Sequence, residues 1–211
     1  MAGDTRFDRV YEIAQQAKRL PEIERFAADA PVFIAGSTWP PDEELLVGLI
    51  ERYPDVKFIV APHEIDPARI EKFCERISRP ALRYTQLTPQ SDLAAAGVLF
   101  VDTIGILSSV YRYGRWGYIG GGFGAGIHNT LEAATFGLPL AFGPRYGKFR
   151  EARDLVTLRG AASIASAEEL ERWFAGLHDD PDATGRSGTI CKEYVLQHKG
   201  ATARIMDEIC R

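Results

Sequence analysis

Apolar residues follow two patterns along this chain: short uninterrupted runs, and longer segments in which they recur every three or four positions. The short runs predict buried strands, and the longer segments predict amphipathic helices. Strands are expected at 31–38, 55–62, 98–102, 116–120, 138–144 and 161–165, with a shorter one near 82–84. Helices are expected at 7–20, 21–26, 40–53, 66–77, 103–114, 128–137, 148–158 and 167–178, with one or two more within 180–211.

The alternation of strands with helices predicts an α/β fold, because such segments build βαβ units and a parallel sheet. We expect a single Rossmann-like domain over 1–211, with about six parallel strands and helices on both faces. In open sheets of this kind, ligands bind beyond the carboxyl ends of the strands. Five turns are therefore expected to share one cleft: 36–38, 62–64, 102–105, 121–129 and 143–146.

The segment from Trp116 to Pro144 is the centre of the expected site, because a strand, a glycine-rich loop, a helix and a second strand follow one another within it. Residues 120–126 read GGGFGAG. Few side chains there allow backbone N–H groups to approach a ligand, and a helix N-terminus favours an anion. The alternative is that the glycines only make tight turns, although five in seven residues exceed what one turn needs.

Other nucleotide and hydrolase motifs fit poorly. Residues 120–125 match the dinucleotide fingerprint G-x-G-x-x-A only weakly, because no acidic residue ends the following strand at Phe142-Gly143. The P-loop pattern is absent from the sequence. Ser37 lacks the G-x-S-x-G context of a hydrolase nucleophile. We expect no dinucleotide cofactor.

Two histidines are expected in loops at the carboxyl ends of strands. His63 and His128, together with Glu64 and Glu132, could suggest a metal site, but neither H-x-x-x-H nor H-E-x-x-H spacing occurs and no third ligand is evident. We therefore expect no metal.

Asn129 and Glu132 are three residues apart, which places them on one face of the predicted helix. Asn129 could cap this helix or lie near a phosphate, and Glu132 could accept hydrogen bonds from ribose hydroxyls. A basic run follows the last turn of the cleft, and it is either a solvated helix face or a contact for an anionic substrate: Arg145, Lys148, Arg150 and Arg153.

Composition excludes several classes of protein. The net charge of −4 argues against a general nucleic-acid binder. Three widely separated cysteines, Cys74, Cys191 and Cys210, fit neither a disulfide framework nor a metal motif, and indicate a reducing cytosol. The polar start of the chain shows no signal peptide, and no apolar run approaches the roughly 18 residues of a membrane span.

Several stretches together resemble the C-terminal half of 3-deoxy-D-manno-octulosonic acid (Kdo) transferases. They are GDTRFDRV, AGSTWPPDEELL, VLFVDTIGILSSVYRY, YIGGGFGAGIHNTLEAATFGLPLAFGP and KFREARDLV. The resemblance implies a GT-B glycosyltransferase fold in which a C-terminal domain binds CMP-Kdo. It also implies that Kdo passes to a lipid A precursor with inversion and without a metal in the catalytic step. The acceptor site and the catalytic carboxylate would belong to the N-terminal domain, so no catalytic residue is expected in this chain.

The resemblance also implies which residues bind the donor. They are Ser37, Thr38, Pro62, His63, Asp102, Thr103, Ile104, Gly105, Gly121, Gly122, His128, Asn129 and Glu132. We expect the phosphate near 121–129, the ribose on Glu132 and the base on the main chain of 102–105. Many relatives carry an arginine in the turn that here reads Pro62-His63-Glu64, so the phosphate partner at this turn is open.

A typical member of this family is about twice as long, and this chain begins at a segment that follows the interdomain linker, near residues 1–20. We therefore expect an excised donor-binding domain that is inactive alone, from a parent enzyme at the cytoplasmic face of the bacterial inner membrane. One alternative is a domain of another GT-B enzyme that uses a UDP-sugar, as a transferase or an epimerase. The other is a non-catalytic nucleotide-binding module that is complete at 211 residues.

Overall fold

The computed structural model describes residues 3–209, and Cys210 lies outside that range. Its middle layer is one sheet of parallel strands in the order β3-β4-β2-β1-β5-β6-β7, which confirms the predicted α/β fold. The short segment near 82–84 pairs with β4 at the sheet edge, so the sheet has seven strands where we expected about six. The strands are β1 (Val32–Thr38), β2 (Lys57–Pro62), β3 (Ala81–Arg83), β4 (Val98–Phe100), β5 (Trp116–Ile119), β6 (Leu140–Phe142) and β7 (Ala161–Ser163).

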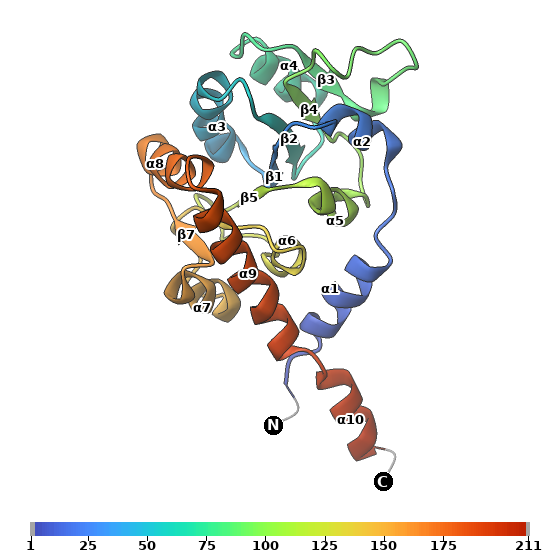
Figure 1. Cartoon of the computed structure of the whole chain (residues 1–211), viewed down its shortest axis with the longest axis vertical. Helices are drawn as coiled ribbons and strands as arrows, with labels where there is room; N and C mark the ends of the chain where they lie inside the picture. Colours follow the sequence, from blue (N-terminus) through green and yellow to red (C-terminus); the bar gives the residue numbers. More distant parts are fainter. Residues whose placement is uncertain (1–2, 210–211) are drawn as a thin grey trace.

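Helices cover both faces of the sheet (Figure 1), because consecutive strand residues point to opposite sides and both sides are apolar. Ile34 and Ile59 belong to one core and Phe33 and Phe58 to the other. The first core is covered by α1 (Arg6–Gln15), α2 (Pro21–Ala27), α5 (Leu107–Val110), α6 (Leu131–Thr135), α7 (Arg150–Leu158) and α9 (Pro181–His198). The second core is covered by α3 (Pro40–Arg52), α4 (Pro67–Cys74) and α8 (Ala167–His178).

Three predicted helices are much shorter than expected: α1, α6 and α5, which has four residues of the predicted 103–114 and continues as a 3-10 turn. In α1 and α6, tertiary hydrogen bonds use the backbone groups that a helix needs. Helix α1 ends at Gln15, and the chain beyond it donates from the Lys18 N–H to Ser109 and from the Leu20 N–H to Tyr113. Helix α6 has five residues rather than about ten. The N–H of His128 is bonded to the carbonyl of Gly120, which ties the preceding residues to the end of β5.

The strand order places the candidate cleft. Strand β1 has β2 as its neighbour on one side and β5 as its neighbour on the other. The chain goes from β1 to β2 first and returns to form β5 later. The connections from β1 and β5 therefore diverge, which opens a crevice beyond their carboxyl ends. The turns 36–38 and 121–129 both border this crevice.

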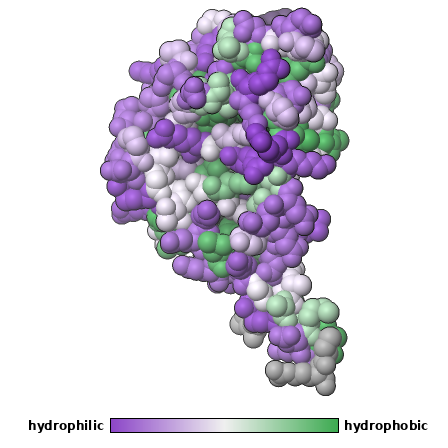
Figure 2. All heavy atoms as spheres, turned by 45° about the vertical axis from the view of Figure 1, so that its right-hand side comes forward, coloured by the Kyte–Doolittle hydropathy of each residue, from purple (hydrophilic) through white to green (hydrophobic). Residues whose placement is uncertain are grey.

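Helix α10 (Ala201–Ile209) projects from the body at the end where the N-terminus also lies (Figure 1). Asp8 of α1 fastens it by accepting hydrogen bonds from the backbone N–H and the hydroxyl of Thr202, at 2.8 and 2.9 Å. The helix carries exposed Met206 and Ile209, and Figure 2 shows apolar atoms on it. Among the described residues, no helix combines the length and the apolar character that crossing a bilayer requires.

His178 predicts a pH-dependent stability. Its hydrogen bond to Asp179, opposed by burial and assisted by Asp55 at 2.8 Å, raises its pKa above the ordinary value. A raised pKa means that the folded state holds the proton more tightly, so this stabilisation is present below about pH 6.5 and is lost as pH rises through the folded pKa. We expect wild type to lose up to about 1 kcal/mol of unfolding free energy relative to His178→Gln between pH 5.5 and 8.5, because the partners are exposed. Urea denaturation at both pH values measures this, and an equal difference at both would contradict it.

Candidate functional site

A fully buried carboxylate, Asp42, joins three of the segments that border the crevice. One of its oxygens accepts hydrogen bonds from the backbone N–H of Trp39 and of Gly121, both at 2.9 Å. The other accepts from the hydroxyl of Tyr118 at 2.6 Å. Burial and the neighbouring carboxylate raise the pKa of Tyr118. Asp42 thus links the exit of β1, strand β5 and the start of the glycine-rich loop.

The glycine-rich loop is a closely packed turn. Gly121 has a φ of 93°, and a Cβ on Gly122 would lie 2.6 Å from the backbone of Gly143. The N–H groups of Gly124 and Gly126 both donate to the carbonyl of Gly121. Packing and turn geometry therefore explain much of the glycine content. The N–H of Gly121 donates to Asp42, so this N–H is used within the protein, and contact between the other N–H groups of the loop and a ligand stays a prediction.

Three aromatic rings from separate segments meet above the crevice. Trp39 stacks on His63, with 4.8 Å between ring centroids, and His63 stacks on His128 at 4.2 Å. The indole Nε1–H of Trp39 donates to Nε2 of His128 at 3.0 Å. The structure thus brings together two predicted residues, His63 and His128, that are far apart in sequence. Burial and the neighbouring His63, opposed by Asp42, lower the pKa of His128.

The exit of β1 is strained. Ser37 has a φ of 54°, a conformation that a residue with a Cβ rarely adopts, and the pairing of β1 with β2 shifts register at this point. Thr38 is fully buried and donates its hydroxyl to Glu43 at 3.0 Å. That hydroxyl therefore holds the exit of β1 to α3, and contact between Thr38 and a ligand stays a prediction. Strain of this kind concentrates at functional sites.

The turn after β2 is positioned by its backbone. Pro62 is buried as the last residue of β2, while His63 is exposed and its N–H donates to the carbonyl of Thr38 at 2.9 Å. Arg69, from the first turn of α4, donates to the carbonyl of Glu64 at 2.8 Å and lies 3.5 Å from Glu43. A guanidinium is thus present close to this turn, although the turn itself has none.

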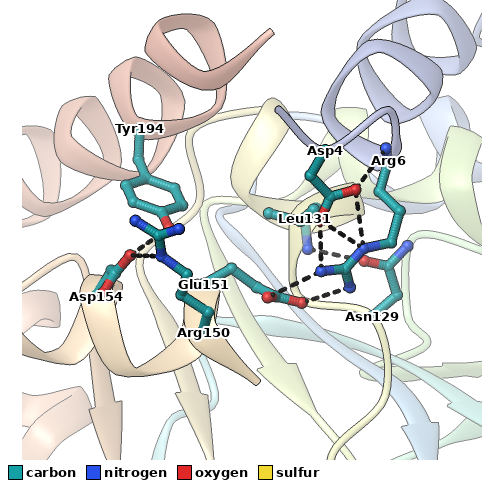
Figure 3. A network of polar contacts seen from close by, with 8 residues as sticks. All are labelled: Asp4, Arg6, Asn129, Leu131, Arg150, Glu151, Asp154 and Tyr194. Atoms are coloured by element: carbon teal, nitrogen blue, oxygen red, sulfur yellow. Dashed lines mark hydrogen bonds and ion pairs between the residues drawn. The ribbon is translucent and has the colours of Figure 1, made fainter. Parts of the chain in front are cut away.

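A pocket of about 370 Å³ separates α1 from the start of α6. Asn129 and Glu132 line it, and the side-chain amide of Asn129 donates to Glu132 at 2.9 Å. Asn129 also caps α6 by accepting from the N–H of Leu131 (Figure 3), so the capping interpretation is confirmed. Burial raises the pKa of Glu132, which the bond from Asn129 only partly offsets.

The wall of this pocket opposite α6 comes from α1. Arg6 lies between Asp4 and the buried Glu151 and pairs with both at 2.8 Å (Figure 3). Arg9 lines the same pocket. A second pocket, of about 410 Å³, lies between the first turn of α3 and the glycine-rich loop, and His128 lines both pockets.

The turn at 102–105 follows β4 and is bonded to the segment that ends β3. Asp102 is buried and accepts from the N–H and the hydroxyl of Thr85 and from Arg83. Burial raises the pKa of Asp102, but these hydrogen bonds outweigh it and the pKa lies below the ordinary value. Thr103 is half-buried, Ile104 is 88% exposed and Gly105 has a φ of 87°. Within residues 3–209, no hydrogen bond joins this turn to the other predicted site residues.

The basic run is divided. Arg145 supports the glycine-rich loop, because its side chain donates to the carbonyl of Gly124 at 2.7 Å and its N–H to that of Gly122. Arg150 pairs with Asp154 at 3.5 Å, as neighbours on α7. A contact between this basic run and an anionic substrate stays a prediction.

Sequence reasoning missed Trp39 and Asp42 as members of the site. The spacing of these two residues could have identified their contact. An acidic residue three positions after the residue that precedes a helix commonly accepts a hydrogen bond from the N–H of that residue. The described residues contain no group of three or more His, Cys, Asp or Glu arranged to hold a metal.

Comparisons with known proteins support the family resemblance. No family model matches the chain. It is 29% identical over 198 residues to a 3-deoxy-D-manno-octulosonic acid transferase of Rickettsia bellii, which covers 90% of this chain and 46% of the relative. It is 25% identical over 182 residues to the enzyme of that name from Chlamydophila psittaci, covering 85% of this chain and 41% of the relative. The chain thus spans less than half the length of these relatives.

Among solved structures, the chain is similar to the C-terminal CMP-Kdo binding domain of WaaA from Acinetobacter baumannii. The TM-score is 0.72 at 22% identity, over 90% of this chain and 99% of that domain. At this identity the likeness concerns the fold, which is that of a GT-B C-terminal domain, as expected. The sequence resemblance to Kdo transferases is confirmed.

Removing the Asp42 carboxylate should destabilise the protein. Asp42→Ala leaves the Tyr118 hydroxyl and the N–H groups of Trp39 and Gly121 without their acceptor, and each buried unpaired donor costs about 1–3 kcal/mol. We expect a loss of about 3 kcal/mol or more in unfolding free energy by urea denaturation. Glu44→Ala on the same helix is the matched control. It removes an exposed ion pair with Arg76, worth under about 1 kcal/mol. Equal losses in the two variants would contradict the role of Asp42.

Proposed function

We propose that this chain binds CMP-Kdo as the donor-binding part of a Kdo transferase, which moves Kdo to a lipid A precursor in lipopolysaccharide biosynthesis. The observation that carries the proposal is the sequence similarity to Kdo transferases over most of this chain. The fold likeness to a CMP-Kdo binding domain agrees with it. The proposal places the parent enzyme at the cytoplasmic face of the bacterial inner membrane, where such an acceptor would be used.

In this proposal the phosphate of CMP-Kdo occupies the crevice between β1 and β5. Ser37, His63 and His128 border it, and their side chains can donate hydrogen bonds to anionic oxygens. When the bond between Kdo and CMP breaks, negative charge grows on this phosphate. Donors held in place before the reaction stabilise that charge without reorganising, which lowers the barrier.

The ribose is assigned to Glu132. A carboxylate can accept hydrogen bonds from two vicinal hydroxyls, and the hydrogen bond from Asn129 holds Glu132 in one orientation. The cytosine is assigned to the main chain of 102–105. Ile104 and Gly105 are exposed, so a ligand can reach this turn.

The assignment of Glu132 is tested by CMP binding. We expect Glu132→Ala to weaken CMP binding at least about tenfold in calorimetry, because the ribose hydroxyls lose a charged acceptor. The matched control is Glu193→Ala, an exposed position on α9, which should bind like wild type. Equal affinities for Glu132→Ala and wild type would overturn the ribose assignment. Competition between CMP and UDP tests the nucleotide, since preference for UDP would favour a UDP-sugar enzyme.

The chain by itself should bind the donor without transferring the sugar. It spans less than half of the relatives' length, and the family resemblance assigns the acceptor site and the catalytic carboxylate to the other half. We expect no Kdo on a lipid A precursor after incubation of the purified 211-residue chain with CMP-Kdo, as measured by mass spectrometry. Catalytic turnover under these conditions would refute the assignment of the acceptor site and the catalytic carboxylate to the other half of the enzyme.

A further inference from the structure

The contact between Trp39 and His128 fixes the protonation state of an imidazole in the candidate site. The indole Nε1 lies 3.0 Å from Nε2 of His128, and the two rings are within 11° of parallel with centroids 6.4 Å apart. Rings so nearly parallel, yet so widely spaced, meet edge to edge. The hydrogen bond therefore runs close to the plane of the imidazole, toward the lone pair of Nε2.

The direction of this bond leaves one possible state of the ring. An indole N–H can donate but cannot accept, so Nε2 of His128 must be without a proton. The imidazole is then neutral and carries its proton on Nδ1, because the partner of one ring nitrogen determines the state of the other. A protonated ring would set two N–H groups against each other.

We propose that Trp39 is a positioning residue for His128: it holds the ring in the neutral Nδ1–H form, which gives the donor site an uncharged hydrogen-bond donor for a phosphate oxygen of the nucleotide. This inference rests on the proposed function. No residue within 3–209 pairs with Nδ1 of His128, and the ring borders both pockets beside the crevice. The donor is thus available where the nucleotide phosphate is expected.

The charges around His128 act in both directions. His63 is stacked on it at 4.2 Å and opposes protonation of His128, whereas the buried carboxylate of Asp42 favours it. The pocket that His128 shares with α1 is lined by Arg6, Arg9, Glu132 and Glu151. The two arginines and two glutamates balance in number, so they favour neither charge state of His128. The hydrogen bond from Trp39 is the contact that favours the neutral imidazole.

Without the indole N–H, two things change. Nothing fixes the tautomer, so only a fraction of molecules carries the proton on Nδ1 at high pH. Nε2 is also free to bind a proton, so the pKa of His128 rises and the imidazolium, which has both N–H groups, restores the donor at low pH. Loss of the indole N–H should therefore weaken nucleotide binding at high pH and not at low pH.

The test replaces Trp39 by Phe, which keeps an aromatic ring against His63 but removes the N–H. We expect the Kd for CMP in Trp39→Phe to exceed that of wild type by about threefold to tenfold at pH 8, and by less than about twofold at pH 6. In nitrogen NMR of the free protein at pH 7, His128 of wild type should show protonated Nδ1 and unprotonated Nε2. The variant should show a mixture of tautomers and a higher pKa.

His128→Asn provides the control background, because an amide cannot titrate or change tautomer. Adding Trp39→Phe to it should change CMP affinity by the same factor at pH 6 and pH 8. The proposal is overturned if wild-type His128 carries its proton on Nε2 or is charged at pH 7. It is also overturned if the single variant loses the same factor at both pH values. Wild type that binds no CMP would overturn the proposed function and the ligand role of His128, while the NMR experiment separately decides the tautomer.

Discussion

Burial of the Asp42 carboxylate is the constraint on which the arrangement of the site depends. A buried carboxylate is tolerated only when donors surround it. Here they come from Trp39, Tyr118 and Gly121, which belong to the exit of one central strand, the body of the neighbouring strand and the loop that follows it. The need to satisfy one anion therefore sets the positions of the two turns that flank the crevice. The same contacts place Trp39 where it can reach His128.

The glycine-rich loop takes a different role once this constraint is recognised. Its backbone packs against Gly143 and bonds to itself and to Asp42, so the loop forms a closely packed turn. This turn carries His128, Asn129 and Glu132 to the pocket between α1 and α6. The side chain of Asn129 has two roles here, because it both caps α6 and orients Glu132. In the proposed site, side-chain donors therefore complement the backbone groups expected from the glycines.

The fold was predicted well, because a parallel sheet with both faces covered leaves a strong signature. Each interior strand is a continuous apolar run, and each helix has apolar residues on one side. Helix ends were predicted less well where the chain bonds to distant residues, as at Lys18 and Leu20. The site was predicted as a set of turns, and the structure does join the turns of His63 and His128. Thr38 and Asp102, by contrast, use their side chains to hold the fold.

The sequence by itself determined the class of fold, the edge of the sheet at which a ligand would bind and the resemblance to Kdo transferases. Hydrophobic periodicity and local motifs carry that information, because both depend on neighbours in the chain. Only the tertiary structure decided which polar groups of the site are hydrogen-bonded within the protein and which are accessible to a ligand. The Asp42 junction spans 79 positions to Gly121 and the Trp39–His128 bond spans 89, and the sheet order that brings them together is set by packing. The protonation state of an imidazole follows from its partner in space, and no pattern along the chain specifies that partner.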